Sequence, residues 1–334
     1  INHPPIRQPS KNSENAAMNS LFLLYLFTSH MSTKFNTFYL LSSICIVVFI
    51  LFFYHICVVL CGFLTQDAPR PIDNCCFLCH TFPYSSNTQR MILGGIFMYL
   101  SDIHTHSIAS GHGTSATISN MAKAASRRGL RLLGITDHGP ATLAAGTPSY
   151  FRSLTYSPRK RFGLELLYGA ELNILDTDGR LDLEDSLLDR LDYAIASMHS
   201  QNYKSGTREE NTLAYINAMK HPQVKILGHC DNPQYPVDYE ALARCAKEEN
   251  VIFEINEASL APYGYRGDTR PGSAAILRCC RKYEIPIVLS SDSHGPEHVG
   301  DFTYAAEFVH EAMFPESLIL NNQIPRLKVF LQTR

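Results

Sequence analysis

The stretch YLSDIHTH at residues 99–106 decides how the rest of the chain is interpreted. It begins as a short, mostly apolar β-strand and ends in a His-x-His pair, His104 and His106. Side chains alternate between the two faces of a strand, so both imidazoles point to the same side. Asp102 precedes the pair, and His112 follows it after a short loop. Two imidazoles on one face of a strand end are a candidate start of a metal site.

Similar short apolar runs recur to the end of the chain. Most are continuously apolar, as expected of strands that are buried on both faces. The strands are expected at 99–104, 132–136, 165–173, 192–198, 224–229, 251–255 and 285–290.

Amphipathic segments with helix-capping residues lie between most of these strands. Residues 208–219 follow Thr207 and include Glu210, which together form the sequence signature of a capping box. Residues 239–249 follow Asp238, a favoured N-cap residue. Further helices are expected at 119–128, 274–283, 302–312 and 324–332.

This alternation predicts an α/β fold in which helices cover a parallel sheet. No glycine-rich phosphate-binding fingerprint follows the first strand, so a TIM-like barrel of seven β–α units is favoured over a Rossmann fold. In a barrel of parallel strands, the carboxyl ends of the strands converge on one mouth, where active sites lie.

Nine candidate ligands fall at or just after the carboxyl ends of six strands. Histidine and carboxylate together suit zinc, iron or manganese, and one carboxylate can bridge two ions. Nine ligands are too many for one tetrahedral ion and suit three. They are His104, His106, His112, His138, Glu171, His199, His229, Asp292 and His294.

The repetition separates these residues from the other histidines. One histidine at a strand end is more often a hydrogen-bonded core or surface residue than a ligand, but seven at equivalent positions favour metal binding. Asp137 precedes His138 and is a candidate to orient a ligand imidazole, with a turn-forming role as the alternative. The histidines interpreted as non-ligands are His3, His30, His55, His80, His221, His298 and His310.

Arginines in the expected loops are candidates for binding a substrate phosphate. Arg266 and Arg270 follow the sixth strand, and arginine pairs well with phosphate. The alternative is that they are solvated loop charges. A second basic group lies in the long loop after the second strand, at Arg152, Arg159, Lys160 and Arg161.

The composition is that of a globular enzyme, with 45% hydrophobic and 18% charged residues and a formal net charge of -2. No block of like charges suggests a long nucleic acid or an anionic membrane as partner. The cysteines after residue 98 suggest no disulfide framework, which suits a cytoplasmic location for residues 98–334. They are Cys230, Cys245, Cys279 and Cys280.

Residues 1–97 differ from the rest and are expected to form a separate N-terminal extension. Their apolar segment at about 38–64 is long enough to be a transmembrane candidate, which would anchor the protein to a membrane. The alternative is a disordered or non-native upstream sequence. Cys75, Cys76, Cys79 and His80 make up only half of a zinc knuckle, so a dedicated zinc site there is disfavoured.

Seven motifs resemble the PHP family, named for polymerase and histidinol phosphatase, over residues 98–334. The resemblance is closest to the small bacterial three-metal phosphatases of that family and implies a distorted (β/α)7 barrel. Cys230 departs from it, because relatives often carry proline there. The motifs are DIHTHS at 102–107, ITDHGP at 135–140, GAELNI at 169–174, ASMHS at 196–200, GHCDNP at 228–233, EINEAS at 254–259 and SSDSH at 290–294.

The resemblance also implies how the ligands are shared among three ions. His104, His106, Glu171 and Asp292 would hold one ion. Glu171 would bridge to a second ion, which His199 and His229 complete. The third set is His112, His138 and His294.

The expected function is metal-dependent hydrolysis of phosphate monoesters by a metal-bound hydroxide, held chiefly by His104, His106, Glu171 and Asp292. Three zinc ions are expected, with manganese, iron or magnesium as alternatives. The expected partner is a small phosphorylated metabolite, and a homo-oligomer remains open. The competing hypotheses are a phosphodiesterase or nuclease of the same family, an amidohydrolase-like enzyme that cleaves C–N bonds, and a non-catalytic metal-binding module.

Overall fold

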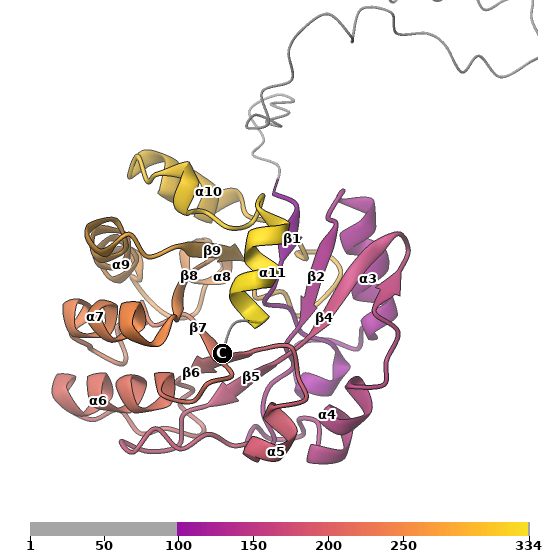
Figure 1. The fold of residues 1–334 in the computed structure, drawn as a ribbon, viewed down its shortest axis with the longest axis horizontal. Helices are drawn as coiled ribbons and strands as arrows, with labels where there is room; N and C mark the ends of the chain where they lie inside the picture. Colours follow the sequence, from indigo (N-terminus) through magenta and orange to yellow (C-terminus); the bar gives the residue numbers. More distant parts are fainter. Residues whose placement is uncertain (1–98, 333–334) are drawn as a thin grey trace, which may run out of the picture. The chain divides into compact units, whose positions relative to one another are not determined.

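The computed structural model describes residues 99–332, which form an α/β fold with two parallel sheets (Figure 1). One sheet has the strand order β1-β2-β4-β3 and the other the order β5-β6-β7-β8-β9. All neighbouring strands are parallel except the short β3, which pairs antiparallel with β4. The strands are β1 Ser101–Asp102, β2 Leu132–Ile135, β3 Lys160–Arg161, β4 Leu164–Tyr168, β5 Ala170–Asn173, β6 Ala194–Ser197, β7 Val224–Leu227, β8 Ile252–Asn256 and β9 Ile287–Ser290.

The prediction of a single strand at 165–173 is wrong, because the segment divides at Gly169 into β4 and β5. The two halves belong to different sheets, with β4 paired to β2 and β5 paired to β6. A Cβ atom on Gly169 would lie 2.7 Å from the Tyr193 carbonyl oxygen, so only glycine fits this close approach. The first strand is also shorter than the predicted 99–104.

Backbone contacts join the two sheets along both edges at the carboxyl ends of their strands. On one side, Thr105 and Ser293 form an isolated parallel bridge, and the Asp292 amide donates to the His104 carbonyl over 3.0 Å. On the other side, His138 and Glu171 form a second parallel bridge. The predicted ligands therefore stand where the two sheets meet.

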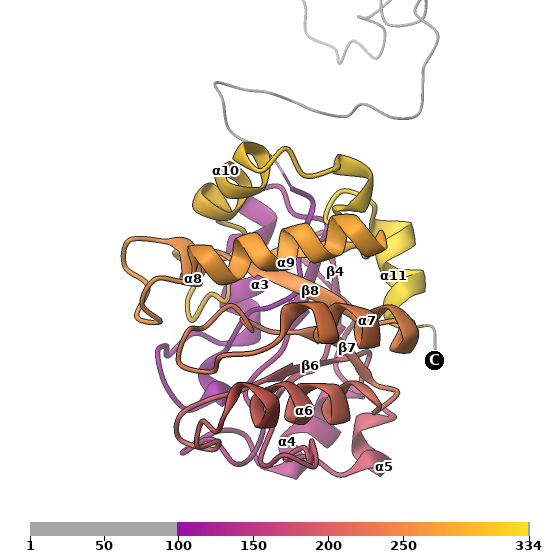
Figure 2. The same ribbon diagram turned by 90° about the vertical axis from the view of Figure 1, so that its left-hand side faces the viewer.

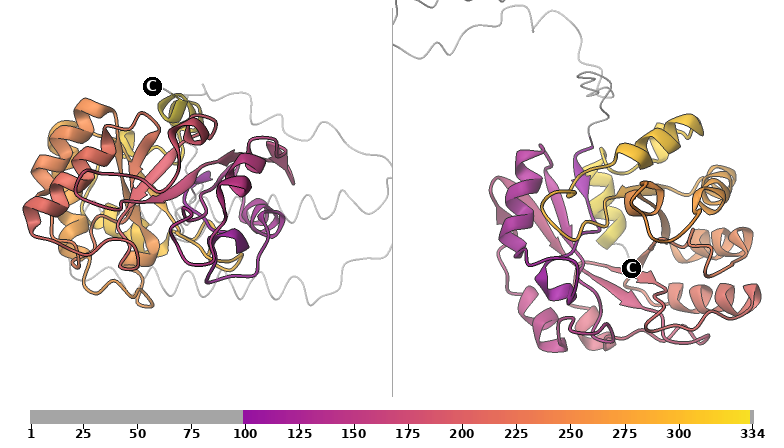
Figure 3. Two further views of the ribbon diagram at one scale, coloured as in Figure 1. Left: turned by 90° about the horizontal axis from the view of Figure 1, so that it is seen from below. Right: turned by 180° about the vertical axis from the view of Figure 1, so that it is seen from behind.

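Helices cover the outer faces of the sheets. In Figures 1 and 2, α6, α7 and α9 lie side by side along the five-stranded sheet, while Figure 3 shows α3 beside the other sheet. The capping box of Thr207 and Glu210 opens α6 as predicted, and Asp238 caps α7. The helices are α3 Ile118–Arg127, α4 Pro148–Leu154, α5 Asp185–Leu188, α6 Arg208–Met219, α7 Tyr239–Glu249, α8 Glu257–Leu260, α9 Arg270–Tyr283, α10 Thr303–Glu311 and α11 Ile324–Gln332, with 3-10 turns at Ile108–Ser110 and Glu316–Leu318.

Asn321, just before α11, joins β1 to β9. Its side-chain amide donates to the Ser101 carbonyl over 2.9 Å and to the Leu289 carbonyl over 2.7 Å. Its side-chain oxygen accepts from the Leu289 amide over 2.8 Å. Asn321 is fully buried, so each of these bonds replaces a contact with water that folding removes.

The predictions made for the extension fall outside the described residues. They concern the boundary at residue 97, the apolar segment at 38–64 and the half zinc knuckle at 75–80. Among the helices of residues 99–332, none combines the length and the apolar character that crossing a membrane requires.

Candidate metal centre

The structure gathers the nine predicted ligands at the carboxyl ends of the strands. His104 and His106 follow β1, His138 follows β2, and Glu171 lies within β5. The remaining ligands are His199 after β6, His229 after β7, Asp292 and His294 after β9, and His112 in the loop between β1 and α3. His112 is exposed at the opening, whereas most of the others are buried.

The Glu171 carboxylate lies at the middle of the cluster and is fully buried. Its Oε1 atom lies 2.9 Å from His229 Nε2 and 3.4 Å from His199 Nε2. Its Oε2 atom lies 2.7 Å from His138 Nδ1 and 3.4 Å from His104 Nε2. One carboxylate thus presents each oxygen to a different pair of imidazoles, which is the arrangement of a bridging ligand.

The Asp292 carboxylate forms a second point of convergence. Its Oδ1 atom lies 3.1 Å from His106 Nε2 and 3.6 Å from His104 Nε2. Asp292 and His229 both have positive φ, at 52° and 28°, a region that is costly for residues with a side chain. Such backbone strain is typical of functional sites, where the surrounding structure holds a side chain in place.

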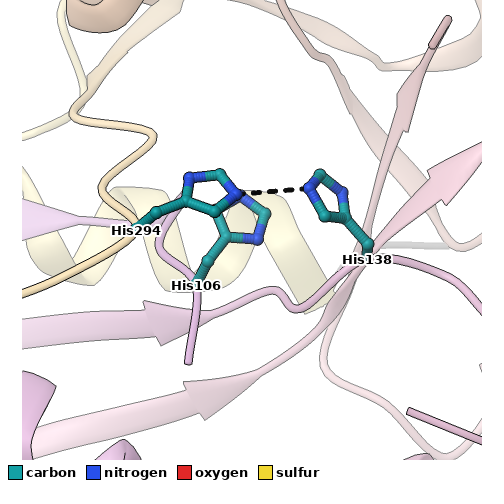
Figure 4. Close-up of side chains that lie close together, drawn as sticks. All are labelled: His106, His138 and His294. Atoms are coloured by element: carbon teal, nitrogen blue, oxygen red, sulfur yellow. Dashed lines mark hydrogen bonds between the residues drawn. The ribbon is translucent and has the colours of Figure 1, made fainter. Parts of the chain in front are cut away.

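His106, His138 and His294 form a third group, whose rings lie close together in Figure 4. The His106 and His294 rings stack with centroids 4.0 Å apart, and His294 Nε2 lies 3.3 Å from His138 Nε2. The His112 ring lies 4.9 Å from the rings of both His138 and His294.

Several ligand atoms are buried and lack any hydrogen-bond partner, which tests whether the cluster suits metal ions. Nε2 of His104 and Nε2 of His106 have none, whereas His138 Nδ1 and Glu171 Oε2 lie 2.7 Å apart without forming an aligned hydrogen bond. Buried polar atoms are normally hydrogen-bonded, so this concentration of unsatisfied lone pairs needs a ligand to complete it. The donor set of imidazole and carboxylate fits zinc or another divalent transition metal.

The surroundings shift the pKa values of the imidazoles in two directions: the carboxylates of Glu254, Glu171 and Asp292 hold the pKa of His104 well above its usual range. Burial lowers the pKa of His106 well below its usual range, and the neighbouring His294 adds to the effect. Burial and the nearby Arg266 cation lower the pKa of His229 to about 4. His106 and His229 are therefore neutral near pH 7, the form in which imidazole binds a metal.

A buried carboxylate that the sequence analysis did not assign, Glu254, supports the centre from β8. Its Oε1 atom lies 2.6 Å from His104 Nδ1 and orients the ring so that Nε2 faces the cluster. Its Oε2 atom accepts from the His229 backbone amide over 2.8 Å and from the Asn256 side chain over 3.0 Å. The available signal was a carboxylate inside the otherwise apolar stretch VIFEI.

Two further partners hold other ligand rings. His199 Nδ1 donates to the Asn173 side-chain oxygen over 2.7 Å. His106 Nδ1 lies 2.8 Å from Ser110 Oγ, which in turn donates to Asp137 over 2.7 Å. Asp137 therefore acts on a ligand of the preceding strand through a serine, rather than on its neighbour His138.

A pocket of about 600 Å³ opens onto the cluster, a size suited to a small molecule. Arg266 lies in its lining, is buried, and pairs with Asp292 Oδ2 over 2.7 Å. Arg270 is not part of this lining: it begins α9, is half-exposed, and pairs with Glu311 over 3.3 Å. The basic residues of the loop after β2 also lie outside the lining.

The family model described as "PHP domain" matches residues 102–258. A protein of Clostridium novyi described as "probable phosphatase" is 39% identical over 236 residues, which are 71% of this chain and 96% of the relative. Another, from Caldanaerobacter subterraneus, is 40% identical over 238 residues, which are 70% of this chain and 91% of the relative.

Among solved structures, one match is a histidinol phosphate phosphatase from Lactococcus lactis, described as complexed with zinc, L-histidinol and phosphate. It is 16% identical, covers 65% of this chain and 95% of that chain, and aligns with a TM-score of 0.49.

Proposed function

This chain belongs to the PHP-domain family, and from that membership we propose that it hydrolyses phosphate monoesters of small metabolites at a centre of three metal ions. The chain is a phosphoester hydrolase, as the relatives described as probable phosphatases indicate. The observation that carries the proposal is the convergence of buried, unsatisfied imidazole and carboxylate atoms at one pocket. We also propose that the two joined sheets are a distorted (β/α)7 barrel.

The ligands would be shared among the ions around Glu171. We propose one ion at His104, His106, Glu171 and Asp292, and a second at Glu171, His199 and His229. The third would be held by His112, His138 and His294. The groups of close donor atoms do not match this division fully. In one of them, His106 lies with His138 and His294.

Zinc or manganese ions bound there would supply Lewis-acid stabilisation of the phosphoryl oxygens and activate a water molecule for attack. The chain's own side chains would position these parts. Arg266 lies in the pocket wall beside Asp292, where its guanidinium would contact the phosphate. Glu254 and Asn173 hold the His104 and His199 rings with Nε2 directed inward.

The rival activities fit these features less well. An amidohydrolase-like enzyme typically uses a metal-bridging modified lysine, whereas no lysine is among the described residues that line this pocket. A structural metal module would close its ligands with cysteines, and this centre instead opens onto a pocket. A phosphodiesterase of the same family remains the second candidate, because the centre itself suits either ester.

The test measures bound metal per chain together with hydrolysis of p-nitrophenyl phosphate and bis-p-nitrophenyl phosphate. We expect two to three ions per chain and faster turnover of the monoester. His106→Ala should lose metal and activity together, whereas His298→Ala, an exposed histidine outside the pocket lining, should retain both. Faster turnover of the diester would favour the phosphodiesterase. Full activity in His106→Ala would refute the proposal.

A further inference from the structure

The outer part of the pocket would contact the alcohol part of the substrate, which is the group esterified to the phosphate. Its wall is built by five loops, those after β1, β2, β6, β7 and α8. Two apolar side chains stand at its exposed edge, Leu143 with 82% and Tyr265 with 79% of its surface exposed. These two side chains give the opening an apolar rim.

Asp292 and Arg266 belong to the metal centre. Apart from these two, no charged side chain lines the pocket among the described residues. Its polar groups are side-chain amides and hydroxyls, and its remaining surface is apolar or aromatic. The amides come from Gln201, Asn202, Asn232 and Gln234.

The two charged side chains of the lining are already paired. Asp292 Oδ2 accepts from Arg266 Nη2 over 2.7 Å, and Asp292 Oδ1 faces His106. Arg266 is also held by the Tyr265 hydroxyl over 3.2 Å and by the Ser259 hydroxyl over 3.3 Å. Neither residue reaches along the wall to a second charged group on the substrate.

Tyr235 strengthens the neutral character of this wall. Its side chain is almost fully buried, and its hydroxyl has no hydrogen-bond partner among the described residues. A phenol is neutral near pH 7, and burial raises the pKa of Tyr235 further, to about 12. The wall therefore offers neutral hydrogen-bonding groups beside apolar surface.

We propose that the substrate is a phosphate monoester whose alcohol part is uncharged and carries hydroxyl or other neutral polar groups. This inference rests on the proposed function and adds the substrate class. An ammonium or carboxylate on the alcohol part would lose its hydration against this wall and find no opposite charge there, which disfavours its binding.

The test uses three phosphate esters whose two-carbon alcohol part ends in a hydroxyl, an ammonium or a carboxylate group: 2-hydroxyethyl phosphate, 2-aminoethyl phosphate and phosphoglycolate. With the full-length metal-loaded protein, we expect kcat/KM for the hydroxyl ester to exceed both others by about tenfold or more. Turnover of the amine or the carboxylate ester at an equal or higher kcat/KM would overturn the inference.

A single-residue change tests whether the wall itself sets this preference. Gln201→Glu places a carboxylate on the wall, so the kcat/KM of the amine ester relative to the hydroxyl ester should rise about two- to fivefold. Gln332→Glu, an exposed position on α11, adds the same charge away from the pocket and should leave the ratio unchanged. An unchanged ratio in Gln201→Glu would contradict the inference.

Hydrolysis of p-nitrophenyl phosphate separates the two levels of failure. If that ester is hydrolysed but the three test esters react alike, the substrate class is wrong and the phosphatase proposal stands. If the metal-loaded protein hydrolyses none of the four esters, the proposed function itself fails.

Discussion

At the scale of single residues, the centre depends on groups that hold the ligands as much as on the ligands themselves. Glu254 is fully enclosed, and its two oxygens contact the His104 ring and the His229 backbone. It therefore holds two predicted ligands that follow different strands. A metal site that loses such a partner usually retains its ligands but binds its ions more weakly.

We expect Glu254→Ala to lower metal affinity and kcat/KM about ten- to hundredfold, because His104 would lose the partner that sets its tautomer. Glu254→Gln should retain more of both, since its amide oxygen can still accept from His104. Titration with zinc, followed by activity, measures the effect. Glu248→Gln, on the exposed side of α7, is the matched control. Wild-type zinc affinity in Glu254→Ala would contradict this role.

The two predicted substrate arginines should behave differently when replaced. Arg266→Lys should lower kcat/KM about tenfold or more. The planar guanidinium of arginine can donate to Asp292 and to a phosphate at once, whereas the single ammonium group of lysine cannot match this geometry. Arg270→Lys should change kcat/KM less than twofold, since Arg270 pairs with Glu311 on the surface. Steady-state kinetics with p-nitrophenyl phosphate compares the two, and equal losses would contradict the placement of Arg270.

The sequence was informative about ligands because strand periodicity and position are local properties. His104 and His106 could be assigned to one face from their spacing alone. Glu254 and Ser110 were missed because their partners lie on other parts of the chain, and no local pattern shows a hydrogen bond between distant residues. Arg270 was expected near the mouth because the start of α9 could not be located from sequence.

At the scale of elements, a buried carboxylate joins the loop after β7 to two helices. Asp231 accepts from the Ser273 hydroxyl of α9 over 2.6 Å and from the Ser259 hydroxyl of α8 over 3.2 Å. Burial raises the pKa of Asp231 from 3.8 to about 6, and these hydrogen bonds only partly offset the effect. Ionising the Asp231 carboxyl therefore costs more free energy in the folded chain than in the unfolded chain.

The raised pKa predicts a pH dependence of stability with a definite sign. The folded chain holds the Asp231 proton more tightly than the unfolded chain, so this contribution is full below pH 3.8 and is lost as pH rises through about 6. Asp231→Asn should remove it. Relative to wild type, the variant's free energy of unfolding should gain on the order of 2 kcal/mol between pH 4 and pH 6.5. Urea denaturation at both values measures this, and a parallel dependence in the two proteins would contradict it.

Element boundaries also show what the sequence left undetermined. The capping box at Thr207 located the start of α6, because the signal lies in adjacent residues. The division of the segment around Gly169 was not visible, because it depends on the close approach of Tyr193 from the following strand.

At the scale of the whole molecule, the ions would act as a clamp between the two sheets. Glu171 and His199 come from the five-stranded sheet, whereas His104 and His138 follow strands of the other. Ligands that bind only the folded state stabilise it in proportion to the logarithm of their concentration over Kd. Metal binding and stability of the described fold should therefore be coupled.

We expect a chelator that strips the metal to lower the Tm by several degrees and re-addition of zinc to restore it. Stabilisation of about 4 kcal/mol follows at a free metal concentration a thousand times Kd. Differential scanning fluorimetry with parallel metal analysis measures the change. A Tm that stays constant after complete metal loss would contradict the clamp.

The bond between Ser101 and Asn321 spans 220 positions of the chain. During synthesis on the ribosome, β1 emerges long before β9 and Asn321, its later neighbours at this seam. His104 and Asp292 therefore cannot meet until almost all of residues 99–332 have left the exit tunnel. A chain that stops before β9 would lack Asp292 and His294, so these two residues complete the centre last.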